Sequence, residues 1–520
     1  MFDWQVVVNN GVTVPGDARK FNSYNQPSVN VDGLVVFRAR SKGGTSGEPA
    51  HGVYTRDMAL RTGVIRLFDR TTEVPQPNNL GTTFVEPPSF PRIDQWSNTI
   101  ASRGNHQPVW TYVLPDGTET RAGTTGVYTN PFGGLIAGAS NLGAVPGFEP
   151  FAVPDEGALK FDVFPGAPAV SDTATIVFKG NYTSALVAHT GVYYRDLTDA
   201  PAGGVPPVVL IANTETLIPG THRPFGSTAP PSAVGRRAVF AGFDNEDNPT
   251  RGGIYLAPLE GPTPRLIELI RIGGPVPGEK KGRVFNKLGE GLSFDGRFVA
   301  FWGAWGTDTT TRVLQCPDEG NKDRVAYCRQ EYPGGYQTTV PVHQGIFVHD
   351  LKTGHTRAVA KAPTDFDDFV YWNFSGLVPG AGSSDDAGEP ARWRFASFVA
   401  VSGLVDGRPT EATFHAAFKA RRGQVDGIYL VEGPGDPKIA TVVEAGMDGT
   451  LLDPAALDPL TETPLPVTEM GIERDGFRGR WLVINASMGT EEAGWAGIYL
   501  TSVLHVRAGH TQSRDSRGRR

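Results

Sequence analysis

Two near-copies of one short stretch hold the side chains of this sequence that are best suited to proton transfer. Residues 99–106 read TIASRGNH and residues 175–182 read TIVFKGNY, and the two align without a gap. Each copy is a run of β-branched and small residues followed by a cation, a Gly-Asn pair and a side chain that can move a proton. We interpret the Gly-Asn pair as a turn, because this dipeptide is common in β-hairpins. The matched positions are Arg103 and Lys179, Asn105 and Asn181, and His106 and Tyr182.

A histidine and a tyrosine backed by two cations suit β-elimination on a uronic acid polysaccharide. The proton next to the uronate carboxylate is weakly acidic, so its removal requires a cation that neutralises the carboxylate. A base must take the proton and an acid must protonate the leaving glycosidic oxygen, and both His and Tyr can do this within hydrogen-bond reach. We expect His106 and Tyr182 to transfer the protons, and the matched cations and Asn residues to bind substrate. The alternative is that His106 closes a loop and Tyr182 packs on a neighbouring blade.

Three further side chains are candidates for the same site. His189 lies in the connection before Gly191, and His222 and Arg223 lie in the loop that leads to the fourth repeat of the chain. We expect His189 and the His222-Arg223 pair to contact the substrate, although each also has a plain structural interpretation.

A recurring signature, Gly followed by Val or Ile and then Tyr or Phe, shows how the chain is organised. Its seven copies recur at intervals of 62 to 92 residues, as structural repeats do. Each unit reads as four short strands without helical periodicity, which is typical of a propeller blade. The sequence therefore predicts an all-β, seven-bladed β-propeller with four-stranded antiparallel blades, in which the signature aromatic residues fill the core. The signatures begin at Gly52, Gly126, Gly191, Gly253, Gly345, Gly427 and Gly497.

The two ends of the chain are expected to close the ring. Trp4–Gly16 matches the fourth strand and Pro-Gly loop of the other units, and the last unit finishes near its third strand, Gly497–Leu500. The N-terminal strand can then complete the last blade, which removes exposed sheet edges; Val503–Val506 competes for this place. We expect one propeller domain over residues 1–509 and a disordered tail over residues 510–520.

The two longest intervals indicate insertions. One, over residues 304–343, lies between a second and a third strand and contains both cysteines, Cys316 and Cys328, which we expect to form a disulfide. The other, over residues 362–394, lies between a fourth and a first strand. Both connections open on the same face of a propeller as the two proton-transfer stretches. Aromatic residues in or near the inserts can stack sugar rings or fill the core, and we take Trp305 as the candidate for substrate binding. These aromatic residues are Trp302, Trp305, Trp372 and Trp393.

Composition bounds the class of protein. The 520 residues are 39% hydrophobic and 20% charged, as in a packed globular protein. The net charge of −7 argues against a dedicated nucleic-acid binder. The sequence contains no run of about 18 apolar residues, so it predicts no membrane-spanning helix. The acidic runs Asp244–Asn248 and Asp365–Asp368 could bind structural calcium, but they lack the ordered spacing of an EF-hand loop, so we interpret them as solvated turns. We expect that the chemistry requires no cofactor or metal. The disulfide favours a secreted or periplasmic protein, and we expect a monomer.

The sequence resembles the seven-bladed polysaccharide lyases, among them the ulvan lyases. The resemblance rests on the propeller repeat over nearly the whole chain and on RGNHQPVW at Arg103–Trp110, followed by FKGNY in the next repeat. In those lyases a His and a Tyr serve as base and acid and an Arg neutralises the uronate carboxylate. This implies His106 and Tyr182 as the proton-transfer pair, and Arg223 or Arg103 as the neutralising group. It also implies a secreted lyase that cleaves an acidic, ulvan-type polysaccharide and leaves an unsaturated uronic acid.

Two other hypotheses stay open at this point. One is a related propeller enzyme that acts at a rhamnose–glucuronate linkage as a lyase or a glycoside hydrolase. The other is a non-catalytic propeller that binds carbohydrate or protein. Ultraviolet absorbance of a new C=C bond identifies a lyase, whereas new reducing ends without absorbance identify a hydrolase.

Overall fold

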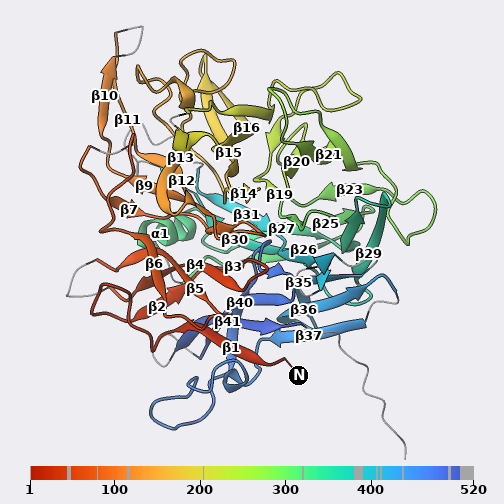
Figure 1. Cartoon of the computed structure of the whole chain (residues 1–520). Coiled ribbons are helices and arrows are strands. Elements are labelled where there is room, and N and C mark those ends of the chain that lie inside the picture. The colour runs from red at the N-terminus through yellow and green to blue at the C-terminus, as the bar shows by residue number, and fades with distance from the viewer. Residues whose placement is uncertain are drawn as a thin grey trace, which may run out of the picture.

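Seven antiparallel sheets form a ring in the computed structural model of this chain (Figure 1). The structure describes residues 2–503 except residues 44–47, 79, 114–116, 203, 319–320, 377, 380–389, 406–407, 410–412, 436–437 and 490–493. The predicted seven-bladed β-propeller is confirmed, with blades of four or five strands. The predicted tail, residues 510–520, lies outside the described residues.

The first four blades follow one another along the chain. Blade 1 contains β2 (Phe21–Tyr24), β3 (Ser28–Val29), β4 (Leu34–Ser41), β5 (His51–Asp57) and β6 (Ile65–Asp69). Blade 2 contains β7 (Phe84–Glu86), β8 (Arg92–Ile93), β9 (Ile100–His106), β12 (Thr125–Phe132) and β13 (Gly134–Ser140), with a hairpin of β10 (Trp110–Val113) and β11 (Glu119–Ala122). Blade 3 contains β14 (Ala169–Ser171), β15 (Thr175–Ser184), β16 (Val187–Asp196) and β17 (Val209–Asn213), and blade 4 contains β18 (Ser227–Thr228), β19 (Ser232–Val234), β20 (Arg237–Phe243), β21 (Gly252–Pro258) and β22 (Ile267–Arg271).

The last three blades carry the longest insertions. Blade 5 contains β23 (Phe285–Leu288), β24 (Ser293–Phe294), β25 (Phe298–Trp305), β28 (Gln344–Asp350) and β29 (His355–Ala362). Blade 6 contains β32 (Val399–Ser402), β35 (Phe414–Arg422), β36 (Val425–Gly433) and β37 (Lys438–Glu444), with the small hairpin β33 (Leu404–Val405) and β34 (Arg408–Pro409). Blade 7 contains β38 (Val467–Gly471), β39 (Phe477–Arg478), β40 (Trp481–Met488), β41 (Trp495–Ser502) and, from the other end of the chain, β1 (Trp4–Asn9).

The repeated signature lies in the third long strand of every blade, and strand geometry explains its composition. Residues i and i+2 of a strand lie on the same face, so the signature aromatic ring covers its own glycine. A Cβ atom on Gly191 would lie 2.6 Å from the Tyr193 hydroxyl, and one on Gly52 would lie 2.9 Å from the Tyr54 hydroxyl. All seven signature aromatic residues are at most 1% exposed, which confirms their predicted place in the core.

The Gly-Asn pairs of the two proton-transfer stretches are not turns, which corrects our interpretation of the sequence. Gly104 and Gly180 lie inside β9 and β15, where Gly180 pairs with Gly191. A Cβ atom on Gly180 would lie 2.6 Å from the ring of Phe161, which packs edge-on against Tyr193 with centroids 4.9 Å apart. The glycine therefore makes room for a core aromatic ring, and both strands continue beyond the Gly-Asn pair.

The N-terminal strand closes the ring, as the sequence predicts. β1 pairs with β41 from Trp4 opposite Thr501 to Asn9 opposite Gly497, and it forms the outer strand of blade 7. The competing strand proposed at Val503–Val506 lies outside the described residues except for its first residue.

Buried ionic contacts fill the centre of the ring. The innermost strands of the seven blades contact one another in cyclic order. Arg92 of blade 2 pairs with Asp475 of blade 7 and donates to the Pro231 carbonyl of blade 4 at 2.9 Å, and Arg478 donates to the Val401 carbonyl of blade 6 at 3.1 Å. Because these charges are buried and paired across the axis, we assign them to holding the blades together.

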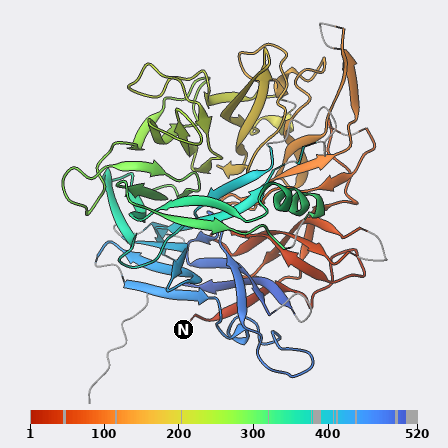
Figure 2. The same cartoon turned by 180° about the vertical axis from the view of Figure 1, so that it is seen from behind.

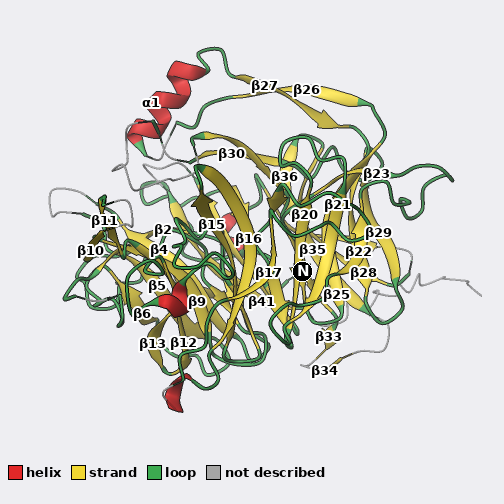
Figure 3. Ribbon diagram, turned by 90° about the horizontal axis from the view of Figure 1, so that it is seen from above, coloured by secondary structure: helices red, strands yellow, loops and turns green. Residues whose placement is uncertain are grey.

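Both predicted inserts lie on one face of the ring, which we call the insert face. One consists of β26 (Thr309–Leu314), α1 (Lys322–Glu331) and β27 (Tyr336–Pro341), between the second and third long strands of blade 5. The other is the hairpin of β30 (Tyr371–Ser375) and β31 (Arg392–Ala396), between blades 5 and 6. Figure 2 shows the first insert lying across the middle of the ring, and Figure 3 shows α1, β26, β27 and β30 together on one side of the molecule. The connections after β9, β15 and β20 open on the same face.

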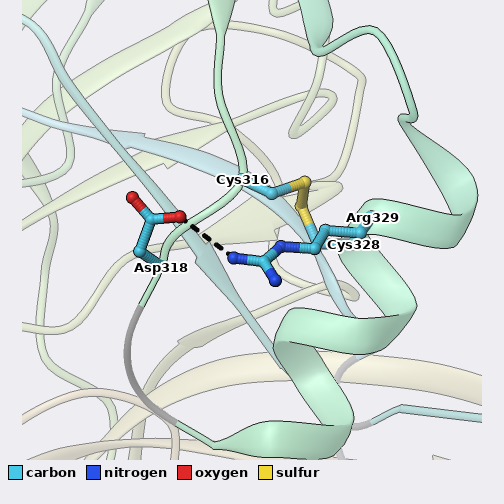
Figure 4. Close-up of a disulfide and its surroundings, with 4 residues drawn as sticks. All are labelled: Cys316, Asp318, Cys328 and Arg329. Atoms are coloured by element: carbon cyan, nitrogen blue, oxygen red, sulfur yellow. Dashed lines mark hydrogen bonds and ion pairs between the residues drawn. A yellow bond between two sulfur atoms is a disulfide. The ribbon is translucent and has the colours of Figure 1, made fainter.

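A disulfide ties the first insert together. Cys316, just after β26, is bonded to Cys328 in α1, as predicted, and Arg329 pairs with Asp318 at 3.0 Å (Figure 4). In the part of the chain that the structure describes, no helix has the length and apolar character that a membrane crossing requires.

Candidate active site

The side chains of β9 alternate between the two blades that flank blade 2. Ile100 belongs to the hydrophobic cluster between blades 1 and 2, and Ala101 belongs to the cluster between blades 2 and 3. His106 therefore lies on the side of blade 1, whereas Arg103 and Asn105 lie on the side of blade 3.

The side chains of β15 alternate in the same way. Phe178 packs in the cluster between blades 2 and 3, and Val177 packs in the cluster between blades 3 and 4. Tyr182 therefore faces blade 2, and its own contacts place it in the same cluster as Phe178. Lys179 and Asn181 face blade 4. The predicted site residues are thus distributed over successive blade interfaces rather than gathered at one point.

The interface between blades 2 and 3 brings four predicted site residues to the same gap. Blade 2 contributes Arg103 and Asn105, and blade 3 contributes Tyr182 and His189, which are directly opposite each other on β15 and β16. Opposite residues of an antiparallel pair share a face. Arg103, Asn105 and His189 are half-buried, and Tyr182 is 1% exposed. A cation, an amide, an imidazole and a phenol therefore border one gap at the insert face.

Tyr182 is held by its neighbours as a proton donor. Its ring stacks on the imidazole of His189, with centroids 4.8 Å apart and planes at 12°. Its hydroxyl accepts a hydrogen bond from Asn213 Nδ2 at 3.2 Å and donates toward Glu156 Oε1 at 3.5 Å. Burial, followed by the charges of Glu156 and Glu215, raises the pKa of Tyr182 to about 12. The phenol is therefore protonated at neutral pH.

His189 is oriented by one further contact. Its Nδ1 lies 2.8 Å from the Thr214 hydroxyl, in the connection that leaves β17. This contact, together with the stack on Tyr182, fixes the ring and leaves Nε2 for another partner. In a neutral imidazole with the proton on Nδ1, Nε2 is an acceptor and can act as a base.

His106 is set up as a neutral base in a different gap. Its Nδ1 lies 2.9 Å from the Gln107 carbonyl, which can only accept, so Nδ1 carries the proton. Burial lowers the pKa of His106, and its Nε2 is enclosed and has no hydrogen-bond partner among the described residues. The side chain is 4% exposed. No hydrogen bond or ring contact joins His106 to Tyr182 in the described structure. The two side chains lie on opposite sides of blade 2, since His106 faces blade 1 and Tyr182 lies in the gap between blades 2 and 3.

Blade 1 adds polar residues to this gap that the sequence analysis missed. Arg38 and Arg40 lie on the same side of β4 as Val36, which packs between blades 1 and 2. Arg38 Nη2 donates to His51 Nε2 at 2.9 Å. Burial, followed by the charges of Arg38, Arg40 and Arg70, lowers the pKa of His51 to about 3. Arg38 stands where Arg103 stands one blade later, so a closer alignment of the second strands would have found it.

Two threonines opposite the matched Asn residues were also missed. Thr125 pairs with Asn105 across β9 and β12, and Thr190 pairs with Asn181 across β15 and β16. The sequence signal is a Thr directly before the signature glycine, which occurs in these two repeats alone.

The remaining predicted residues lie apart from the Tyr182–His189 pair. His222 and Arg223 are exposed in the connection from β17 to β18. That connection borders a cleft of about 740 Å³ on blade 4, lined also by Thr250, Arg251 and Arg271. Trp305 is 3% exposed and packs against the rings of His343 and Phe347, so neither ring face is open to solvent in this structure.

The inserts form a second cleft, of about 340 Å³, from arginines and aromatic rings. Asp368 is 2% exposed and pairs with Arg312 and Arg421, two of the arginines that line the cleft. The ring of Trp393 packs on Tyr336 and Phe374, which joins the two inserts. The aromatic residues considered for sugar stacking are therefore used in part to hold the inserts together. The cleft is lined by Arg312, Val313, Leu314, Gln315, Val370, Tyr371, Trp372, Trp393 and Arg421.

The acidic runs considered for calcium are engaged with the protein itself. Asp244 accepts hydrogen bonds from the amides of Thr250 and Arg251, and Asn245 caps the turn that follows. In the second run, Asp365 and Asp367 accept backbone amides and Asp368 pairs with the two arginines.

Comparison of the sequence with protein-family models finds no match, and comparison with curated protein sequences finds none. Among solved structures, the polysaccharide lyase Uly1 is similar with a TM-score of 0.40 and 9% identity, over 94% of each chain. Prolyl oligopeptidase B from Galerina marginata is similar with a TM-score of 0.38 and 10% identity, over 90% of this chain and 47% of its own, so this chain spans about half its length. The α-L-arabinanase of Penicillium chrysogenum, solved with arabinobiose, has a TM-score of 0.29 and 11% identity, over 93% and 98% of the two chains. At this level of identity the similarity concerns the fold and not the chemistry.

Proposed function

We propose that this propeller is a polysaccharide lyase that cleaves a uronate-containing polysaccharide of the ulvan type by β-elimination between blades 2 and 3. The observation that carries the proposal is the stacked pair of Tyr182 and His189 on the face of blade 3 that is turned to blade 2. Strand alternation puts Arg103 on the opposing face of blade 2. A protonated phenol, an imidazole and a guanidinium are the acid, the base and the neutralising cation that the reaction needs.

Each group has one role in the proposed reaction. Arg103 pairs with the uronate carboxylate and stabilises the negative charge that develops there. His189 Nε2 removes the proton from C5, and the electron pair of that bond forms the C4=C5 double bond as the C4–O4 bond breaks. Tyr182 donates its proton to O4 of the leaving sugar. His189 then returns its proton, through solvent, to the Tyr182 phenolate.

This assignment differs from the one drawn from the sequence, in which His106 is the base, and a pair of matched substitutions separates them. Asn can reproduce the Nδ1 contact of either histidine, to Gln107 or to Thr214, while it removes Nε2. We expect His189→Asn to lower lyase activity by about 10²-fold or more, and His106→Asn to retain most of it. Activity is measured as the ultraviolet absorbance of the new C=C bond on a panel of uronate polysaccharides.

Three other results would overturn parts of the proposal. Loss of activity in His106→Asn alone would return the base to the interface between blades 1 and 2. Reducing ends without absorbance would identify a hydrolase. No product from any acidic polysaccharide, with the protein folded, would favour a non-catalytic binding propeller.

A further inference from the structure

The Lys179 side chain is a largely buried cation that pairs with no residue the structure describes. It is 8% exposed, and it makes no hydrogen bond or ion pair with a described residue. Removing part of the hydration shell of an ammonium group without pairing the charge costs free energy. Because lysine buries its methylene stem and keeps its ammonium end in contact with water, the exposed remainder lies at the charge. A negatively charged partner would offset the cost, so the position indicates an anion site.

Two neutral polar groups accompany Lys179 on the same face of blade 3. Asn181 is two residues further along β15, and Thr190 lies directly opposite it on β16. Asn181 Oδ1 is buried and has no hydrogen-bond partner among the described residues. The Thr190 hydroxyl lies 3.1 Å from that of Thr228 in blade 4. The gap between blades 3 and 4 therefore contains an ammonium, an amide and two hydroxyl groups.

The same arrangement occurs one interface earlier. Arg103, Asn105 and Thr125 occupy the corresponding positions of blade 2, with Asn105 directly opposite Thr125. Arg103 faces blade 3, whereas Lys179 faces blade 4, so the two cations border successive gaps on the insert face. A polymer that carries an anionic group on more than one residue would meet them in turn.

We propose that Lys179, Asn181 and Thr190 form a second anion-binding subsite, which holds the carboxylate or sulfate of a sugar near the one bound at Arg103. The inference takes its substrate class from the proposed function. It means that the acidic polysaccharide runs along the rim of the insert face, from the gap between blades 2 and 3 to the gap between blades 3 and 4.

Calorimetry in the Tyr182→Phe background tests this subsite without cleavage of the ligand. The first probe is a glucuronate-containing tetrasaccharide with two uronate residues, and its matched partner has one uronate reduced to glucose. We expect Lys179→Met to weaken binding of the two-uronate probe by about tenfold or more and to leave the matched partner unchanged. A third probe with sulfate in place of the second carboxylate shows which anion the subsite prefers. Lys352→Met, in an exposed turn on the opposite face of blade 5, is the control.

Thermal unfolding of Lys179→Met gives a second, independent readout. Because the substitution removes a partly dehydrated charge that no described residue pairs, and keeps the length of the side chain, we expect the variant to unfold at a higher temperature than the parent. Equal losses for all three probes, no loss for any, or a lower unfolding temperature would each overturn the proposal. Lysine-dependent binding without any lyase activity would support the subsite and refute the proposed reaction, so the two failures are distinguishable.

Discussion

Tyr182→Phe separates a proton donor from a packing residue, because it removes one oxygen and keeps the ring on His189. The hydroxyl accepts from Asn213 at 3.2 Å and donates toward Glu156 at 3.5 Å, the second a long contact. Leaving the Asn213 amide unpaired in a buried place costs about 1–2 kcal/mol of unfolding free energy. Loss of a general acid lowers the rate by about 10²- to 10⁴-fold, or about 3–5 kcal/mol in the activation barrier.

Tyr193→Phe is the matched control in the same blade. Tyr193 is fully buried in the core, and its hydroxyl has no hydrogen-bond partner among the described residues. We expect its unfolding free energy to change by less than about 0.5 kcal/mol and its activity to stay at the parental level. Denaturant unfolding and the rate of C=C formation are measured on both variants. A Tyr182→Phe variant that keeps more than about a tenth of the parental rate would refute the role of Tyr182 as the acid.

Gly180, His51, Tyr182 and the disulfide can each be tested by substitution or by pH. Gly180→Ala places a Cβ 2.6 Å from the Phe161 ring and should cost about 1–3 kcal/mol in denaturant unfolding, whereas Gly63→Ala, with open space around it, should be nearly neutral. Because folded His51 has a pKa of about 3 and an unfolded histidine one of about 6.5, the unfolded chain binds more protons between these values. Stability should therefore fall as the pH drops below about 6.5, by roughly 1–2 kcal/mol after discounting for partial exposure, and His51→Asn should remove this part of the pH dependence of the unfolding temperature. Because the pKa of Tyr182 is about 12, we expect that ionisation of this phenol does not lower the lyase rate below roughly pH 11. A decrease of the rate near pH 9 in the parent protein, absent from the residual activity of Tyr182→Phe, would contradict this prediction. Replacing both cysteines with serine should increase hydrogen exchange in α1, by local destabilisation of about 2–3 kcal/mol, while the unfolding temperature of the blades stays the same.

The fold could be predicted because its main determinants are local and repeated. A glycine two residues before an aromatic residue recurs once per blade, since each blade needs the same ring over the same strand. The closing strand followed from the Pro-Gly loop after Trp4–Asn9. The sequence did not predict the hairpin of β10 and β11. Residues 110–122 resemble no segment of the other blades, so comparison of the repeats gave no sign of an added hairpin there.

The site was harder to predict because register along a strand does not reveal which neighbouring blade a side chain faces. His106 and Tyr182 occupy matched positions, and for that reason they point into different gaps. The contact between Tyr182 and His189 depends on the pairing of β15 with β16. A separation of seven residues allows these two residues to pair across a hairpin. We did not expect this pairing, because we interpreted the Gly-Asn pair before Tyr182 as the turn. The partners Arg38, Thr125 and Thr190 required alignment of all the second and third strands.

A crystal structure of Tyr182→Phe with a bound uronate tetrasaccharide would show which blade interface holds the polysaccharide. We expect a carboxylate on Arg103, C5 of the same sugar residue facing His189 Nε2, and O4 facing the position of the missing hydroxyl. A sugar bound instead between Arg38 and His106, or in the cleft formed by Arg312, Tyr371 and Trp393 of the inserts, would contradict it.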